Sequence, residues 1–329
     1  MIISQTPIRI SLSGGGTDLK EYYSVKGGLV VSTAIDKYLF VVVKERFDDL
    51  IYVNYTKKEI VNNWDEVQHE LVREAAKITG MPSGVEITML ADIPSEGSGL
   101  GSSSSLTVGL LNAFYNYQGL QVTSEKLASE ACKIEIDILN KPIGKQDQFI
   151  AAYGGVRSII FNEDDSVNVR KVKISGDLLR RLGANLLLFY TNVTRKSASI
   201  LTEQKSNVNR NIEFHDEIKE LGLKLLYSLE TGNIDEVGKL LHQNWMAKKK
   251  LSSNITNDEI DVMYEKSVRG GAIGGKIAGA GGGGFLLSYC RREKQDDLRY
   301  AMRDFKELPF MLEPHGSKII FDYRRYNWK

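Results

Sequence analysis

The sequence carries no excess of charge of either sign. Its 329 residues include 43 Lys and Arg against 42 Asp and Glu, which leaves a formal net charge of +1. A broad surface for nucleic acid needs a clear basic excess. The balance therefore argues against a nucleic-acid partner, although a local basic pocket is compatible with it.

Cysteine and long apolar runs are scarce as well. Cys132 and Cys290 are too few for a disulfide framework and lack the spacing of metal ligands. No uncharged apolar run approaches the ~18 residues that a membrane helix needs. The first residues lack the basic segment and apolar core of a signal peptide. These features predict a soluble protein of a reducing, cytoplasmic compartment, with no membrane partner.

What is present predicts a folded chain of two units. Hydrophobic residues make up 42% of the sequence, an ordinary share for a globular protein. The length exceeds what one hydrophobic core usually spans. Regular strand patterns resume at NLLLFYTN (185–192) after a less regular stretch. We place the boundary near residue 177, which gives units 1–177 and 178–329.

The most unusual stretch is GSGLGSSSS (97–105), which lies between a predicted strand (84–90) and a predicted apolar, buried helix (104–118). Glycine lets the backbone approach a ligand closely and adopt positive φ. The first N–H groups of a helix attract anions. The pattern therefore predicts a phosphate-binding loop, although not a Walker loop, because no Lys follows the last glycine. The alternative is a mobile linker, which seldom joins a strand to a buried helix.

Two further glycine clusters flank predicted strands, SGGGTD (13–18) and GAGGGGF (279–285). A single such cluster is usually a tight turn, but three of them suggest loops that meet around one ligand. A dinucleotide-binding fold would need an acidic residue ~20 residues after its glycine loop. Asp36 has about that offset, yet the strands beside it look antiparallel and the long helices come too late for alternating βαβ units.

Three motifs together resemble those of the GHMP small-molecule kinases: PIRISLSGGGTD (7–18), PSEGSGLGSSSS (94–105) and KIAGAGGGGF (276–285). Within that family, GGGTDL, IGKQDQFIAAYGG and FYTNVTRKSASIL look most like bacterial D-glycero-D-manno-heptose 7-phosphate kinases. The resemblance implies an α+β, two-lobed fold with a ribosomal-protein-S5-like N-terminal domain and a ferredoxin-like C-terminal domain.

The resemblance also implies an ATP site and a magnesium site. The ATP phosphates would be bound by Gly97, Ser98, Gly99, Leu100, Gly101, Ser102, Ser103 and Ser104. Mg²⁺ would be held by Glu135, seven residues before Pro142, and by Ser102. Glu130 is the rival, because the two glutamates occupy opposite edges of the buried stripe of the helix predicted from Thr123 or Ser124 to Leu139. For either, a solvated helix edge is the alternative.

Asp147, in GKQDQ, matches the family's catalytic aspartate and would accept the proton of the reacting hydroxyl. Its alternative role is to cap a helix that begins at Gln148. Arg9 would keep Asp147 ionised and stabilise the transferring phosphoryl group. Its alternative is a surface salt bridge.

Thr17 and Asp18 would face the sugar, and the competing interpretation of Asp18 is a helix N-cap. The substrate set implied by the first and third motifs is Gly14, Gly15, Gly16, Thr17, Asp18, Gly281 and Gly282. A strand-entry turn is the alternative for the third motif. Candidates for a phosphate already on the substrate are Lys145, Arg195 and Lys196. The four histidines have no ligand spacing and receive no role.

The expected activity is transfer of the γ-phosphoryl group of ATP, with Mg²⁺, to the anomeric hydroxyl of a heptose 7-phosphate. The product would serve the synthesis of nucleotide-activated heptose for surface polysaccharide. Alternatives are a GHMP kinase for a galactose- or fucose-like sugar or for a non-sugar alcohol, and a nucleotide- and sugar-binding regulator without catalysis. The partner is a small sugar phosphate, and the chain is expected to be a monomer or homodimer.

Overall fold

Two long antiparallel strands, β1 (Ile2–Ser13) and β2 (Gly28–Glu45), run through the centre of the computed structural model, which describes residues 1–93, 97–193 and 197–323. The first residues of β1 alternate between buried and half-buried, but all residues from Thr6 onward are buried. The two ends of β1 differ because the sheet is covered on both faces only beyond Thr6. The glycine loop that follows β1 therefore starts in the interior.

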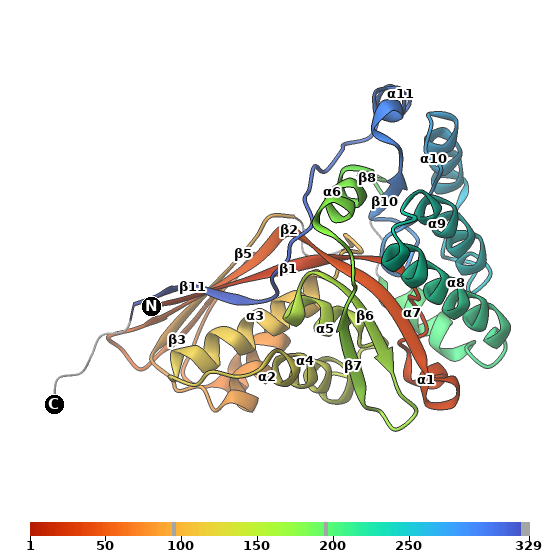
Figure 1. Cartoon of the computed structure of the whole chain (residues 1–329). Helices are drawn as coiled ribbons and strands as arrows, with labels where there is room; N and C mark the ends of the chain where they lie inside the picture. The colour runs from red at the N-terminus through yellow and green to blue at the C-terminus, as the bar shows by residue number, and fades with distance from the viewer. Residues whose placement is uncertain (94–96, 194–196, 324–329) are drawn as a thin grey trace.

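The larger sheet has eight strands and divides into two wings along β2 (Figure 1). The second half of β2 pairs with β5 (Val85–Ala91), and the first half pairs with β6 (Val156–Phe161). The sheet is completed by β3 (Ile51–Asn54), β4 (Lys58–Val61), β7 (Val167–Lys171) and β11 (Lys318–Asp322). All the described pairings are antiparallel except β3 with β5, which does not fit a doubly wound parallel sheet.

Four helices cover one face of this sheet (Figure 1). They are α2 (Glu70–Thr79), α3 (Ser102–Tyr117), α4 (Ser124–Cys132) and α5 (Gln146–Tyr153). Most of α3 is buried, because it packs on β1 and β2 and is itself flanked by α2, α4 and α5. The predicted burial of this helix is confirmed. A short helix, α1 (Lys20–Lys26), joins β1 to β2.

The second half of the chain builds a smaller sheet in the order β8-β10-β9, from β8 (Leu186–Tyr190), β9 (Gly274–Ile277) and β10 (Phe285–Tyr289). Its helices are α6 (Gly176–Ala184), α7 (Ser197–Ser206), α8 (Ile212–Thr231), α9 (Asp235–Lys248), α10 (Asp258–Arg269) and α11 (Gln295–Ala301). Helix α8 packs on β1 and β2, and α9 packs on β9. The two halves are thus in direct contact, and the last strand, β11, returns to pair with β1.

Several element boundaries differ from the sequence prediction. The helical spacing of Val67, Leu71, Ala75 and Ile78 predicts one helix within residues 63–79 that ends at Gly80. The structure has a 3₁₀ turn, Trp64–Glu66, and then α2, which Gly80 ends in the left-handed conformation as predicted. The helix expected to reach Leu139 is α-helical only to Cys132 and continues as a π-helix, Lys133–Ile138. Both cysteines are buried and free. Among the described residues, no helix combines the length and apolarity needed to cross a bilayer.

Candidate active site

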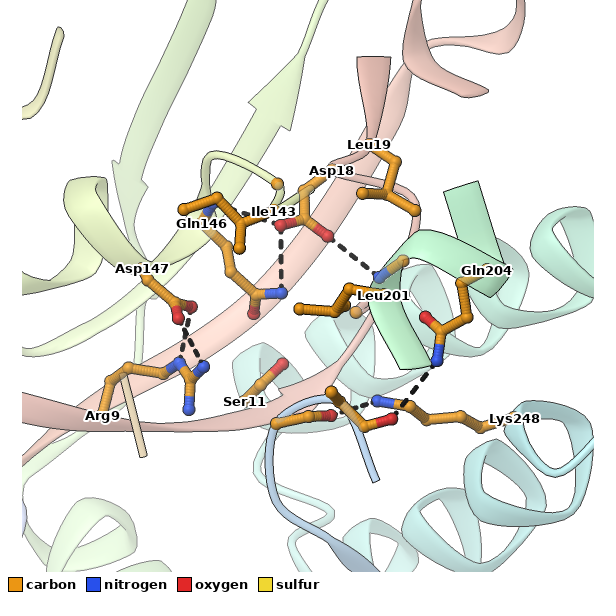
Figure 2. A pocket seen from close by; sticks show the side chains of 15 residues that line it. Arg9, Ser11, Asp18, Leu19, Ile143, Gln146, Asp147, Leu201, Gln204 and Lys248 are labelled. Carbon is orange, nitrogen blue, oxygen red and sulfur yellow. Dashed lines mark hydrogen bonds and ion pairs between the residues drawn. The ribbon is translucent and has the colours of Figure 1, made fainter. Parts of the chain in front are cut away.

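The first and third glycine-rich motifs line a pocket between the two halves of the chain (Figure 2), and the second motif adjoins it through Gly99, which contacts Arg9 and the third motif. The first supplies the loop after β1, the second lies at the start of α3, and the third joins β9 to β10. Helix α5, the end of α9 and helix α7 complete the wall. The pocket is lined by Arg9, Ser11, Gly15, Gly16, Asp18, Leu19, Ile143, Gly144, Gln146, Asp147, Leu201, Gln204, Lys248, Gly279 and Ala280.

The described part of the second motif has the conformation of an anion-binding loop. Gly97, Gly99 and Gly101 have φ of 71°, 72° and 80°, which side chains with a Cβ rarely adopt. Gly101 directly precedes α3, whose first N–H groups have no partner within the helix. The Oγ atoms of Ser98 and Ser102 lie 3.2 Å apart. The described loop is therefore an ordered turn that leads into the N-terminus of α3.

The third motif packs directly against the second. A Cβ on Gly99 would lie 2.5 Å from the carbonyl oxygen of Ala278, and one on Gly279 would lie 2.5 Å from that of Gly99. Glycine is therefore required on both sides of this contact. Gly279 and Ala280 line the pocket. Gly281 and Gly282 contact Ile255 instead: a Cβ on Gly281 would lie 2.8 Å from Ile255 O, and Gly282 donates its N–H to the same oxygen at 2.7 Å. The structure thus brings a different part of the third motif to the pocket than the predicted Gly281 and Gly282.

Arg9 and Asp147 form a two-pronged ion pair at one side of the pocket (Figure 2). Nε of Arg9 donates to Oδ1 at 2.7 Å and Nη2 donates to Oδ2 at 2.6 Å. Nη1 of Arg9 donates to Gly99 O at 2.5 Å, which ties the pair to the phosphate loop. Arg9 is 4% exposed, so the surface-salt-bridge alternative does not hold. Asp147 lies inside the first turn of α5 and caps nothing, because that helix begins at Gln146.

Asp18 faces the same pocket from the loop after β1. Its Oδ1 accepts the N–H of Gly16 at 2.9 Å, and its Oδ2 accepts Nε2 of Gln146 at 3.1 Å. Burial raises the pKa of the Asp18 carboxyl, the hydrogen bond from Gly16 opposes this, and the charge of Asp147 adds to it. The N-cap alternative for Asp18 fails, because the N-cap of α1 is Leu19.

The remaining residues of the first motif divide into two groups. Gly15 and Gly16 line the pocket. Gly14 has φ 90°, and a Cβ there would lie 2.0 Å from Leu29 O. Thr17 Oγ1 lies 2.8 Å from Gly14 O and accepts the N–H of Leu29 at 3.1 Å. Gly14 and Thr17 therefore shape the loop, while Gly15, Gly16 and Asp18 face the ligand space.

The π-helix places Glu135, not Glu130, beside the start of α3. Glu135 is fully buried and accepts hydrogen bonds from Ser103 Oγ at 2.9 Å and Gln148 Nε2 at 2.7 Å. Burial raises the pKa of the Glu135 carboxyl, which Lys141 and the hydrogen bonds from neighbouring side chains partly offset. Glu130 instead accepts from Tyr115 Oη at 2.8 Å. Ser102, predicted as a metal ligand, has Ser98 as its side-chain partner, whereas Ser103 and Ser104 hydrogen-bond to Glu135.

Of the predicted phosphate ligands, Lys145 is the one that the structure describes, and it does not line the pocket. Lys145 points into a neighbouring hollow, where its Nζ lies 2.8 Å from Asp165 Oδ1 and 5.1 Å from the centre of the Tyr23 ring. Arg195 and Lys196 lie outside the described residues.

Sequence reasoning missed four polar side chains of the pocket: Ser11, Gln146, Gln204 and Lys248. Ser11 and Gln146 stand inside the quoted motifs PIRISLSGGGTD and GKQDQ but have no predicted role, and Gln204 and Lys248 belong to no motif. For Lys248 a signal was present, because it follows Leu241 and Trp245 at helical spacing, and both are fully buried. A lysine on an apolar stripe indicates a buried ammonium group. The others are polar residues of ordinary type, and only the folded chain brings them together.

Comparisons with known proteins agree with this arrangement. The model of the GHMP kinases N terminal domain matches residues 64–155, and that of the GHMP kinases C terminal domain matches residues 225–307. The chain is 30% identical to the D-glycero-alpha-D-manno-heptose 7-phosphate kinase of Campylobacter jejuni, over 92% of this chain and 93% of the relative. It is 26% identical to the galactokinase of Pyrococcus furiosus, over 100% of this chain and 95% of the relative.

Solved structures show the same fold. A D-glycero-D-manno-heptose 1-phosphate kinase from Bacteroides thetaiotaomicron superposes with a TM-score of 0.83 at 24% identity, covering 98% of this chain and all of that one (100%). A putative sugar kinase from Campylobacter jejuni superposes with a TM-score of 0.78 at 28% identity, covering 97% of each chain. The predicted two-lobed α+β fold is confirmed.

Proposed function

This chain belongs to the GHMP kinase family and is an ATP-dependent sugar kinase, and we propose that it phosphorylates the anomeric hydroxyl of D-glycero-D-manno-heptose 7-phosphate. The observation that carries the proposed chemistry is the Arg9–Asp147 ion pair, which is bonded to the phosphate loop through Gly99. The printed activity of the Campylobacter jejuni relative supports this choice of acceptor. The 1,7-bisphosphate formed would supply nucleotide-activated heptose for surface polysaccharide.

The proposed reaction is a direct transfer. The anomeric oxygen forms a bond to the γ-phosphorus while the bond to the β,γ-bridging oxygen breaks, and ADP leaves with that electron pair. Asp147 accepts the proton of the hydroxyl. Arg9 keeps the Asp147 carboxylate ionised and lies where charge develops on the transferring group. Backbone N–H groups of residues 97–104 hold the β- and γ-phosphates. The protein thus acts chiefly by positioning and charge neutralisation.

Glu135 is the proposed protein ligand of Mg²⁺. Its carboxylate is fully buried, and among the described residues no Lys or Arg nitrogen lies within ion-pair distance of it. A buried carboxylate with only neutral partners is costly unless a cation accompanies it. No group of three or more His, Cys, Asp or Glu side chains within residues 1–93, 97–193 and 197–323 could hold a metal. Mg²⁺ fits, because it takes phosphate oxygens and water besides one carboxylate and the hydroxyl of Ser102 or Ser103; when bound, it would neutralise charge on the phosphates.

The rest of the proposal concerns the acceptor and the assembly. Gly15, Gly16 and Asp18 would contact the sugar, and Lys145, Arg195 and Lys196 are the proposed ligands of its 7-phosphate. The units 1–177 and 178–329 would form the two lobes, with ATP and acceptor bound between them. A cytoplasmic monomer or homodimer is proposed.

The test is a panel of hexoses, heptoses and their phosphates, each offered with ATP and Mg²⁺, with the new phosphate located by NMR. We expect turnover of the heptose 7-phosphate and a new resonance for phosphate on the anomeric oxygen. Phosphorylation of free galactose or fucose without turnover of the heptose phosphate would replace the proposed acceptor. The likeness to the Pyrococcus furiosus galactokinase makes that the second candidate. Absence of any acceptor-dependent ATP consumption would favour a binding regulator.

A further inference from the structure

Lys248, the last residue of α9, places a buried ammonium group in the pocket from the second half of the chain (Figure 2). It is 4% exposed, and its Nζ donates a hydrogen bond to the carbonyl oxygen of Gly279. Among the described residues, no carboxylate oxygen lies within ion-pair distance of Nζ. An ammonium group has three donors. Two of them therefore have no described partner, in a place where water would be displaced by a ligand.

Two polar side chains, Ser11 and Gln146, converge with Lys248 at Gly15. A Cβ built on Gly15 would lie 3.5 Å from Ser11 Oγ, 3.5 Å from Gln146 Nε2 and 4.0 Å from Lys248 Nζ. Gly15 thus marks a small space that is ringed by polar atoms and that any side chain at this position would begin to fill. The three neighbours come from β1, α5 and α9, so only the assembled fold creates this space.

Unsatisfied polar atoms surround the same space. Ser11 Oγ, Gln146 Oε1 and His215 Nε2 are buried without a hydrogen-bond partner. His215 Nε2 would lie 3.6 Å from a Cβ on Gly16. A single unpaired polar atom in a protein is unremarkable, but buried polar groups are nearly always paired. Several of them around one pocket indicate a ligand that offers many hydroxyl groups.

The charges around Lys248 favour a neutral ligand group at this point. Asp18 and Asp147 are close enough to raise the pKa of its ammonium group, and Arg9 lowers it. A dianionic phosphate placed between Asp18 and Asp147 would be repelled by both. A sugar hydroxyl meets no such penalty, because it can donate to Asp18 and accept from Lys248.

We propose that Lys248 determines acceptor specificity by donating a hydrogen bond to a sugar hydroxyl oxygen beside the one that Asp18 binds. The Asp18 carboxylate and the Lys248 ammonium would then bind two neighbouring hydroxyls. Such a site favours a polyol over an alcohol that has a single hydroxyl. The bond from Lys248 to Gly279 also couples the occupied acceptor site to the third glycine motif, which abuts the phosphate loop at Gly99. This inference rests on the proposed sugar kinase activity and adds a residue that none of the three motifs contains.

The decisive variant is Lys248→Met, which keeps the length and apolar stem of the side chain and removes its donors. We expect the KM for the heptose phosphate to rise at least tenfold, with the KM for ATP unchanged within twofold. Lys248→Arg should recover part of the loss. Lys250→Met is the matched control, since Lys250 is half-exposed, carries an ion pair with Glu217 at 3.7 Å and lies outside the pocket. It should behave as wild type.

A second readout uses pH. Burial lowers the pKa of Lys248 to about 8, with Asp18 and Asp147 opposing this and Arg9 reinforcing it. The other titratable groups that face it are His215 on α8, whose burial lowers its own pKa, and Lys276 on β9. Only the charged ammonium donates to the hydroxyl with full strength. The kcat/KM for the acceptor should therefore be highest below pH 8 and fall as the pH rises through that value.

In Lys248→Met the fall of kcat/KM for the acceptor above pH 8 should disappear, while kcat/KM for ATP should depend on pH as in the wild type. Isothermal titration of the acceptor into the enzyme without ATP gives the same comparison without catalysis. If the wild type phosphorylates the acceptor but Lys248→Met binds it with unchanged affinity, the inference about Lys248 is wrong and the proposed function stands. If the wild type phosphorylates no sugar, the proposed function fails first. Should Lys248→Met not fold, Lys248→Gln takes its place in the same titration, and acceptor binding with unchanged affinity in that variant overturns the inference.

Discussion

Two buried cations face the pocket from opposite halves of the chain, and they differ in one respect. Arg9, on β1, has both prongs of its guanidinium on Asp147 at 2.6–2.7 Å. Lys248, on α9, has a single carbonyl partner and no described carboxylate within ion-pair distance. The guanidinium of Arg9 has its charge partner before any substrate binds, whereas the ammonium of Lys248 gains further hydrogen-bond partners only from a ligand. The first half of the chain thus holds a preorganised reaction centre, and the second half contributes the proposed recognition of the acceptor sugar through Lys248.

The largest expected effect on turnover comes from breaking the Arg9–Asp147 ion pair. Asp147→Asn removes the base and leaves the buried Arg9 without its charge partner, so kcat should fall by roughly 10²–10⁴-fold, the usual contribution of a general base. Steady-state kinetics with saturating ATP and acceptor measures this. Asp177→Asn is the control, because Asp177 is largely exposed and pairs only with Arg180 on the surface. A turnover near that of wild type in Asp147→Asn would remove Asp147 from the mechanism.

A third buried charge, Glu135, resembles Lys248 in having no ion-pair partner among the described residues. Glu135→Gln should raise the Mg²⁺ concentration needed for half-maximal activity by roughly tenfold or more, the scale of loss when a metal site is altered. Glu130→Gln is a matched control on the same helical segment, since Glu130 is bound by Tyr115 and not by the serine loop. Removal of Mg²⁺ with EDTA should abolish turnover in both variants. Equal Mg²⁺ dependence of the two variants would remove Glu135 as the metal ligand.

The space beside Lys248, which Ser11 and Gln146 also border, can be narrowed with one methyl group on Gly15. Gly15→Ala meets only ordinary contacts of 3.5–4.0 Å, so the protein should fold with a near wild-type melting temperature while the acceptor KM rises several-fold. Gly14→Ala is the contrasting variant, because its Cβ would lie 2.0 Å from Leu29 O at φ 90°. It should lose stability instead. Thermal melts and acceptor KM measured together separate the two, and an unchanged acceptor KM in Gly15→Ala would place the sugar elsewhere.

The smallest effect is expected at Lys145. Its ammonium is already engaged by Asp165 at 2.8 Å, and such partly exposed pairs contribute about 0–1 kcal/mol. Lys145→Ala should therefore raise the KM for a phosphorylated acceptor by less than tenfold, with Lys219→Ala as a surface control. A larger rise that is confined to phosphorylated acceptors would show that Lys145 leaves Asp165 to bind the phosphate.

The choice between Glu130 and Glu135 shows where sequence reasoning stopped. A helical wheel at 100° per residue puts them on opposite edges of one stripe, and nothing in the wheel separates them. The wheel assumes an unbroken α-helix, but residues 133–138 form a π-helix with more residues per turn. The change of period turns Glu135 toward Ser103. Sequence periodicity could not reveal this, because the π turn depends on the packing of α4 against α3 and α5.

Some pocket residues could be identified from the sequence, and others only from the folded structure. Asp18, Arg9 and Asp147 could be named because they stand in or beside recognisable motifs. Gln146 lies next to Asp147 in the sequence, yet its role depends on the distance to Asp18, 128 positions away. Lys248 shows as a lysine on an apolar stripe, which predicts burial but not the site that it faces. Gly281 and Gly282 were predicted at the substrate, but Gly279 and Ala280 line the pocket instead.

The sequence alone determined the local conformations: the left-handed glycines, the apolar helix α3, the end of α2 at Gly80 and the three loops able to bind anions. These features depend on steric limits and hydrogen-bonding capacity within a few residues, which the order of residue types encodes directly. Only the tertiary structure decided which glutamate faces the serines, which part of the third loop reaches the pocket, and that Lys248 meets Gly15. Those outcomes depend on contacts between segments that are distant in the sequence, from 32 positions for Ser103 and Glu135 to more than 200 for Gly15 and Lys248, and their geometry is set when the sheet and helices pack.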